Sequence, residues 1–145
     1  EKPYSRSEVM AAVGAVCAAI EVVDSRWRAW PQVAPGWAVA DLSANGALIH
    51  GTGLSAWHEI DLSIAPIRLE IEGHPAADAI GGNAAGDPVR LMVWLANHAS
   101  RRGAGLKVGD VVTTGSCTGM SFADAGSQIR VALRGIGEVE VRLER

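Results

Sequence analysis

Residues 18–26 read AAIEVVDSR and place a single carboxylate, Glu21, inside an apolar and β-branched run. Such a run is typical of a buried strand, and we predict a strand over residues 20–23. An unpaired carboxylate there would cost several kcal/mol, so Glu21 needs a partner. Two partners remain open: an ion pair with Arg26 or Arg28, or a metal ion, because cations such as Mg²⁺ prefer carboxylate oxygens. One glutamate is not by itself a metal site.

Two helices are predicted from their start and stop signals. Ser5 and Glu8 have the spacing of a capping box, which predicts a helix from there to about residue 19. Asp87 followed by Pro88 suits the start of a second helix, with Asp at the cap and Pro at the first helical position. That helix is expected to end near residues 101–103, which read Arg-Arg-Gly.

The rest of the chain reads as short strands separated by Gly and Asn. Residues 27–37 are rich in Trp and Pro and are expected to form an ordered loop. The predicted strands cover residues 38–41, 47–51, 60–64, 67–71, 111–113, 129–133 and 139–143, and the last two form a hairpin through residues 135–137. The sequence therefore predicts an α+β fold that is predominantly β.

Composition bounds the class of protein. The chain has 145 residues and a formal net charge of -3, which fits one soluble domain over residues 1–145. No basic cluster is denser than Arg101-Arg102, which argues against a nucleic-acid surface. No apolar run near the start approaches the roughly 20 residues that cross a bilayer. Cys17 and Cys117 form neither a disulfide framework nor a zinc spacing, so we expect a reducing, cytoplasmic location.

Two loops could carry chemistry. Residues 113–119 read TTGSCTG, and the amides and hydroxyls of such a turn either bind an anion or cap their own backbone. No His lies close in sequence to activate Cys117, which disfavours a nucleophilic role. Residues 41–46 present polar groups at a strand end, as a binding site or as an Asx-turn. The four histidines are scattered along the chain, so zinc is not expected.

Four stretches in this order resemble the 2-keto-4-pentenoate hydratase group of the fumarylacetoacetate hydrolase superfamily. They are residues 18–26, residues 39–41 with Gly46 and Gly51, residues 86–88 with 93–97, and residues 106–116. The resemblance spans essentially the whole chain. It implies a mixed, mostly β fold with two main helices packed outside, and a homo-oligomer. It also implies an enzyme that acts on small 2-oxo or 2-hydroxydienoic acids with Mg²⁺ or Mn²⁺.

The resemblance also assigns site residues. Glu21 matches the third of three carboxylate metal ligands. Gly115 and Ser116 fall where relatives bind the substrate carboxylate, and Thr118 lies on the same turn. At residues 41–46 the pattern departs from the usual Asp-Asn-Ala-Ser, and either Ser43 or Asn45 is expected to take over the substrate contact.

A larger departure concerns the other ligands that the resemblance implies. The family takes its first two carboxylates from a Glu-x-Glu pair about 30 residues before the third, and a catalytic Lys from further upstream. Position 21 leaves no room for them, so the chain is expected to be the C-terminal portion of such an enzyme, without its N-terminal part. Three functions stay open: a hydratase, a 4-oxalocrotonate-type decarboxylase, and a non-catalytic scaffold that lacks the full metal site.

Overall fold

The computed structural model describes residues 2–103 and 105–144. The elements in chain order are α1 (Arg6–Ala12), β1 (Ala19–Val23), α2 (Pro35–Ala40), the 3₁₀ turn η1 (Leu42–Ala44), β2 (Asn45–His50), β3 (Pro66–Ile71), β4 (His74–Ile80), α3 (Pro88–Arg101), β5 (Gln128–Leu133) and β6 (Gly137–Arg142). This architecture confirms the predicted α+β class with mostly sheet. Within the described ranges, no helix has both the length and the apolarity to cross a bilayer.

Two antiparallel sheets form the body of the molecule. β4, β3, β5 and β6 lie in that order in a four-stranded sheet, and β1 pairs with β2 in a separate ribbon. The ribbon packs against the sheet near β6. The core between them is made of buried aliphatic side chains: Ala18, Ile20, Ile67, Leu69, Ile129, Val131 and Val139. The alternating burial of β3 and β5 follows from the two-residue period of a strand.

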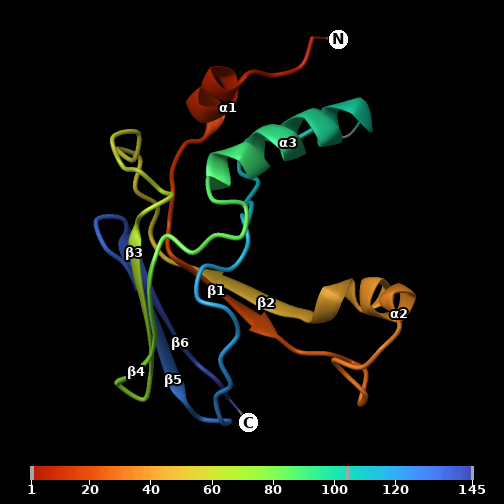
Figure 1. Cartoon of the computed structure of the whole chain (residues 1–145), viewed down its shortest axis with the longest axis vertical. Coiled ribbons are helices and arrows are strands. Elements are labelled where there is room, and N and C mark those ends of the chain that lie inside the picture. The colour runs from red at the N-terminus through yellow and green to blue at the C-terminus, as the bar shows by residue number, and fades with distance from the viewer. Residues whose placement is uncertain (1, 104, 145) are drawn as a thin grey trace.

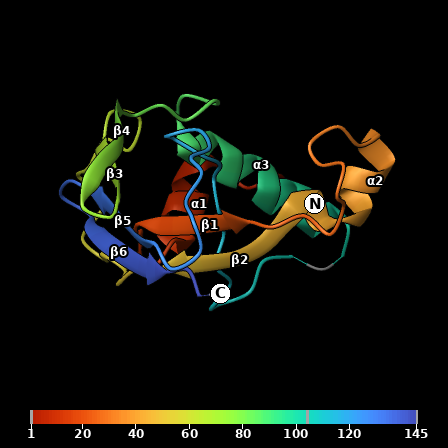
Figure 2. The same ribbon diagram turned by 90° about the horizontal axis from the view of Figure 1, so that it is seen from below.

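The ribbon continues beyond the sheet as an arm (Figure 1). β1 and β2 extend away from the four-stranded sheet, and α2 lies at the far end of this arm. α1 and α3 pack against each other, and in Figure 1 they lie above the arm. Figure 2 shows the same separation from below, with α2 on one side and the sheet on the other.

The predicted start signals of both helices are confirmed. Ser5 and Glu8 form the reciprocal capping box, and the hydrogen bonds from Ser5 hold the pKa of the Glu8 carboxyl below its usual value. Asp87 caps α3, and Pro88 occupies its first turn. α1, however, ends at Ala12 rather than near residue 19. Val13 is extended and Val16 forms a β-bridge with Leu54, as the β-branched residues around Gly14 favour.

Three predicted strands are wrong, each for a local reason. Residues 38–41 belong mainly to α2, which Pro35 starts at its first helical position. Residues 60–64 form turns, in which the Asp61 carboxylate accepts the N–H and hydroxyl of Ser63. Residues 111–113 are not in a strand, and no backbone–backbone hydrogen bond joins them to another described residue.

The sequence reasoning missed β4. Its residues, His74–Ile80, include Pro75 and several alanines, which are poor strand formers. The strand exists because it pairs with β3 across the tight turn Glu72-Gly73, where both residues have positive φ, 51° and 75°. The hairpin of β5 and β6 was predicted and is confirmed, with Leu133 paired to Gly137.

Removal of the α3 cap tests how this helix is held. The Asp87 carboxylate accepts the N–H of Val89 at 2.9 Å and pairs with Arg6 at 2.5 Å. We expect Asp87→Ala to lower the free energy of unfolding by about 1 kcal/mol in urea denaturation. Asp87→Asn keeps a capping oxygen and is expected to lose less than half as much. Equal losses in the two variants would assign the effect to the ion pair with Arg6.

Candidate functional site

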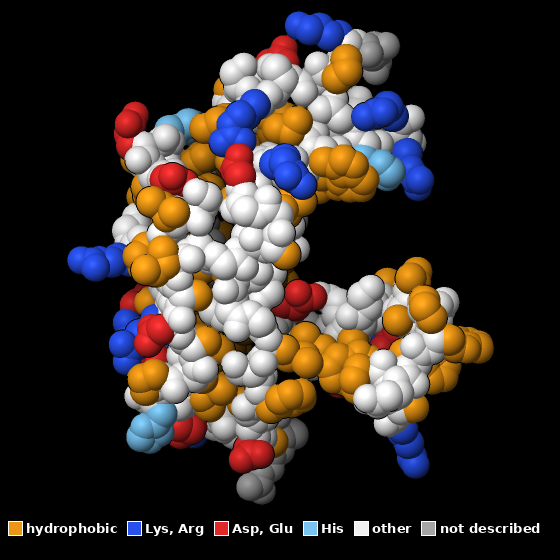
Figure 3. Space-filling model, viewed as in Figure 1, with side chains coloured by type: hydrophobic (Ala, Val, Ile, Leu, Met, Phe, Trp, Pro, Cys, Tyr) orange, Lys and Arg blue, Asp and Glu red, His pale blue; other side chains and the backbone are white. Residues whose placement is uncertain are grey.

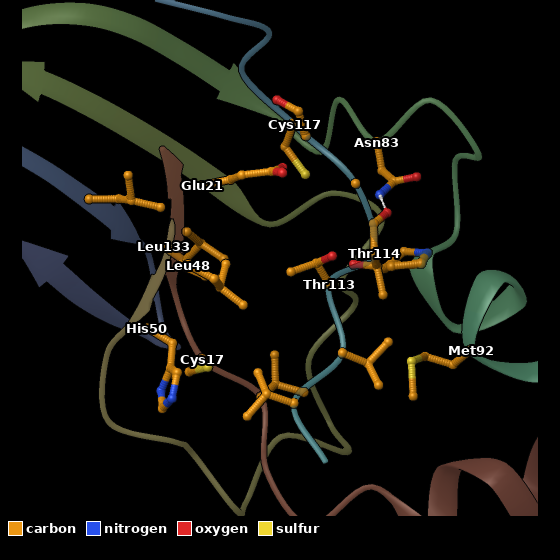
Figure 4. Close-up of a pocket in the computed structure, with 18 of the residues that line it drawn as sticks. Cys17, Glu21, Leu48, His50, Asn83, Met92, Thr113, Thr114, Cys117 and Leu133 are labelled. Atoms are coloured by element: carbon orange, nitrogen blue, oxygen red, sulfur yellow. Dashed lines mark hydrogen bonds between the residues drawn. The ribbon is translucent and has the colours of Figure 1, made fainter. Parts of the chain in front are cut away.

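An open groove of about 1550 Å³ runs between the ribbon, α3 and the loop of residues 105–123. Figure 4 shows its walls: Glu21, Leu48 and His50 come from the ribbon, and Met92 comes from α3. Thr113, Thr114 and Cys117 come from the loop, which passes opposite the ribbon. The groove therefore brings residues 19–23, from the first stretch singled out in the sequence, opposite residues 113–119, from a separate one.

The pairing of β1 with β2 decides which side chains reach the groove. Glu21 lies opposite Leu48, and Ala19 lies opposite His50. These four share one face of the ribbon, while Ile20 on the other face joins the core. Glu21 is thus exposed to the groove, and the expectation of a carboxylate inside a buried strand is wrong. His50 was not identified from the sequence; the register with β1 is the signal that places it here.

Glu21 has a neutral partner. The side-chain amide of Asn45 donates to Glu21 Oε1 at 3.1 Å. No ion pair of Glu21 occurs among residues 2–103 and 105–144, so the hypothesis of a bridge to Arg26 or Arg28 is wrong.

Arg26 pairs instead with Asp41, at the end of the ribbon next to α2. Asp41 is 5% exposed, and its carboxylate lies 2.8 Å from Arg26 Nε and 2.6 Å from the hydroxyl of Ser25. Arg26 also donates to the carbonyls of Asp24 and Asn45, at 2.7 and 2.9 Å. This network joins the end of β1 to the start of β2. The sequence contained both partners, but not the left-handed turn that brings them together.

That turn contains three consecutive residues with positive φ. Leu42, Ser43 and Ala44 have φ of 52°, 56° and 64°. Residues other than Gly and Asn rarely adopt this backbone conformation. Ser43 is exposed in this turn and is not among the groove-lining residues. Asn45 follows directly and reaches Glu21. The prediction that Ser43 or Asn45 contacts a substrate stays a prediction.

The loop of residues 113–119 is anchored from α3's side of the groove. The Asn83 amide donates to the carbonyl of Thr114 at 2.6 Å, and a Cβ on Gly82 would collide with the carbonyl of Cys117 (Figure 4). Asn83 was not identified from the sequence. It is buried, and its carbonyl accepts the N–H of Ala85, so both ends of its side chain are held.

The Ser116 hydroxyl is used inside the loop. It donates to the carbonyl of Gly119 at 3.1 Å and accepts the N–H of Thr118 at 3.3 Å, as in an ordinary capped turn. The backbone N–H groups of Gly115 and Ser116 have no protein acceptor among the described residues. The Ser116 hydroxyl thus caps the turn, and anion binding by the free amides stays a prediction.

The described residues include the type of donor atom that a divalent metal ion takes, but too few such donors to form a complete site. Glu21 offers carboxylate oxygens at an open groove, the donor type that Mg²⁺ and Mn²⁺ take. No group of three or more His, Cys, Asp or Glu side chains that would hold an ion occurs within residues 2–103 and 105–144. Glu21 alone does not make such a site, because these ions take several oxygen ligands.

The Arg26–Asp41 pair is expected to hold the end of the ribbon next to α2. Arg26→Ala leaves the buried Asp41 carboxylate with only Ser25 and a backbone N–H as donors. We expect the free energy of unfolding to fall by about 2 kcal/mol in urea denaturation. The control is Arg28→Ala, because Arg28 makes no ion pair within the described ranges. An Arg28→Ala loss as large as that of Arg26→Ala would contradict the role of the pair.

Cys117 is expected to react slowly with alkylating reagents. Burial raises the pKa of the Cys117 thiol above its usual value, and a hydrogen bond with Asn83 offsets this only in part. The thiol therefore stays protonated near neutral pH. In Cys17→Ser, we expect the iodoacetamide reaction rate to keep rising past pH of about 8.5, where an unperturbed thiol is half ionised. A rate that levels off below that pH would indicate an activated thiolate.

Comparison with known proteins identifies relatives along the whole chain. The chain is 29% identical over 138 residues to a 2-hydroxyhexa-2,4-dienoate hydratase of Comamonas testosteroni, covering 95% of this chain and 52% of that protein. It is 30% identical over 144 residues to a 2-keto-4-pentenoate hydratase of Paraburkholderia xenovorans, covering 99% and 53%. The chain spans about half the length of the curated relatives it matches.

A solved structure and a family model agree with these relatives. The 4-oxalocrotonate decarboxylase of Pseudomonas putida G7, complexed with magnesium and adipate, superimposes with a TM-score of 0.82 at 28% identity, covering 95% of this chain and 52% of that one. The model of the fumarylacetoacetate (FAA) hydrolase C-terminal family matches residues 2–144. The chain therefore belongs to the fumarylacetoacetate hydrolase C-terminal family.

Proposed function

We propose that the chain is the C-terminal part of a divalent-metal-dependent hydratase that adds water to a 2-hydroxy-2,4-dienoate. The observation that carries the proposal is the groove, where the charged Glu21 carboxylate faces the loop of residues 113–119. A carboxylate suits a cation, and a turn with free amides suits a substrate carboxylate. The names of the curated relatives support the class of reaction.

In this proposal each segment has a distinct role. Glu21 is one ligand of Mg²⁺ or Mn²⁺, and the other ligands come from a region outside this chain or from another chain. A bound cation would supply Lewis acidity toward the 2-oxo oxygen of the substrate. The N–H groups of Gly115 and Ser116, with the hydroxyl of Thr118, hold the substrate carboxylate. Asn83 keeps these donors at the groove edge by fixing Thr114.

The apolar part of the groove wall has its own role. Leu48 lies beside Glu21 across the ribbon, and Leu133 and Met92 line the same cavity. These side chains would pack against the hydrocarbon part of a dienoic acid and keep water from it except along the open side. The free amides of the loop, a carboxylate that suits a cation and an apolar wall together support a small organic acid as substrate.

A decarboxylase is the second candidate, because solved structures of a 4-oxalocrotonate decarboxylase superimpose with TM-scores of 0.80 and 0.82. The identity to this enzyme, 28%, is close to the 29% shared with a hydratase, so sequence similarity does not separate the two. The two reactions differ in product, since only the decarboxylase releases carbon dioxide.

Assembly is also part of the proposal. Hydrophobic side chains gather on the arm, where Trp37, Val39 and Leu42 are all more than half exposed (Figure 3). Exposed apolar patches of this kind occur at protein interfaces. We therefore propose that the chain forms homo-oligomers in the cytoplasm.

Parallel assays test the reaction. The chain, together with the region or partner chain that supplies the other metal ligands, is incubated with Mn²⁺ and either 2-hydroxypenta-2,4-dienoate or 4-oxalocrotonate. Water addition and carbon dioxide release are measured. We expect hydration that Glu21→Gln abolishes, because the amide lacks the ligand charge. Glu59→Gln, at an exposed position outside the groove, is the matched control and should keep activity. Carbon dioxide release would select the decarboxylase, and the absence of both reactions would favour a non-catalytic scaffold.

A further inference from the structure

Asn45 is the residue that holds the Glu21 carboxylate, and its contact points to a role other than substrate binding. Its side-chain amide donates to Glu21 Oε1 at 3.1 Å, and Asn45 itself is not among the groove-lining residues. We propose that Asn45 is a positioning residue, which orients Glu21 so that its second oxygen faces the groove and a divalent cation. This inference rests on the proposed function, in which Glu21 is a metal ligand.

A one-residue bulge places Asn45 on the correct face of the ribbon. Val22 pairs with Ala47, but Val23 pairs with Asn45, so Gly46 is an extra residue in β2. In an unbroken register Gly46 would lie opposite Val23, and Asn45 would lie one step further, opposite Asp24. Its side chain would then point to the core side of the ribbon. The bulge turns it to the side of Glu21.

Residue 46 has to be a glycine for this bulge to form. A Cβ at position 46 would lie 2.8 Å from the Asp24 Cβ and 3.0 Å from the carbonyl oxygen of Val22. Both distances are shorter than ordinary van der Waals contact. The close approach of the strands at Gly46 is thus part of what directs the Asn45 amide toward Glu21.

The backbone of Asn45 is fixed from the other side by the Arg26–Asp41 network at the end of the ribbon next to α2. Its carbonyl accepts from Arg26 Nη1 at 2.9 Å, and Arg26 is held by the buried Asp41. The preceding carbonyl, that of Ala44, accepts the N–H of Asp24 at 2.8 Å. An amide on a fixed backbone restricts the rotamers of the carboxylate to which it donates.

The neutrality of Asn45 matters for a cation site. An arginine or lysine in its place would orient Glu21 equally well, but its charge would cancel that of the carboxylate and repel a cation. An amide orients the carboxylate without cancelling its charge. No other hydrogen bond to the Glu21 carboxylate occurs within residues 2–103 and 105–144, so Oε2 has no protein donor there. Hydrogen-bonded support of this kind is general for carboxylates that bind metals.

Paramagnetic broadening by Mn²⁺ tests the proposal on the ¹⁵N-labelled chain without any turnover. In the wild-type chain we expect broadening of amide signals centred on Glu21 and its partner Leu48. In Asn45→Ala, the Mn²⁺ concentration that gives half of this broadening should rise roughly tenfold or more. Ser43→Ala, in the adjacent turn, is the matched control and should stay within about twofold of wild type, since Ser43 does not contact Glu21.

The outcomes separate this inference from the proposed function. Wild-type broadening that Asn45→Ala leaves unchanged would overturn the positioning role and leave Glu21 as a ligand. The absence of broadening around Glu21 in the wild-type chain would overturn both. The urea midpoint of each variant is measured alongside, and if Asn45→Ala does not fold, Asn45→Val, which suits a strand, takes its place. The same tenfold weakening is expected for it.

Discussion

The antiparallel pairing of β1 with β2 is the constraint on which the rest of the molecule depends. A strand presents alternate residues to opposite sides, so one ribbon serves two environments. Ile20 and Val22 pack on the four-stranded sheet, while Glu21 and its partner Leu48 face the groove. A shift of one residue in this pairing would exchange the two faces and bury the carboxylate. The core and the candidate site are therefore fixed by one set of hydrogen bonds.

Local signals in the sequence identified those elements whose ends are set by neighbouring residues. The capping box at Ser5, the Asp87 cap and the β5–β6 hairpin all follow from contacts within a few residues. Elements that depend on distant partners were missed. β4 has poor strand formers and exists through its pairing with β3, and the helix after Ser5 is shortened because Val16 pairs with Leu54. Tertiary contacts override local propensity in both cases.

Some residues of the candidate site could likewise be predicted from the sequence, and others could not. Glu21 and the turn at residues 113–119 stand out in the sequence because a carboxylate or a cluster of hydroxyls is unusual in its surroundings. The residues that hold Glu21 and the turn in place do not stand out in the sequence. Asn83 lies about 30 residues before the loop that it anchors, and the contact of Asn45 with Glu21 depends on a bulge. Ion pairs were the least predictable feature. Proximity in sequence offered Arg26 or Arg28 as one possible partner of Glu21, but the turn after α2 brings Asp41 to Arg26 instead.

The left-handed turn at Leu42–Ala44 has a consequence for how this region diverges among related chains. The backbone there meets two geometric conditions, since it returns from α2 to pair with β1 and it delivers one extra residue into β2. Substitutions by residues that tolerate positive φ, such as Gly or Asn, would leave the path of this turn intact. A deletion or insertion of one residue would shift the register of β2 and turn each of its side chains to the opposite face of the ribbon. We infer that in this segment the amino acids are free to vary more than their number, and that gaps in an alignment should avoid it.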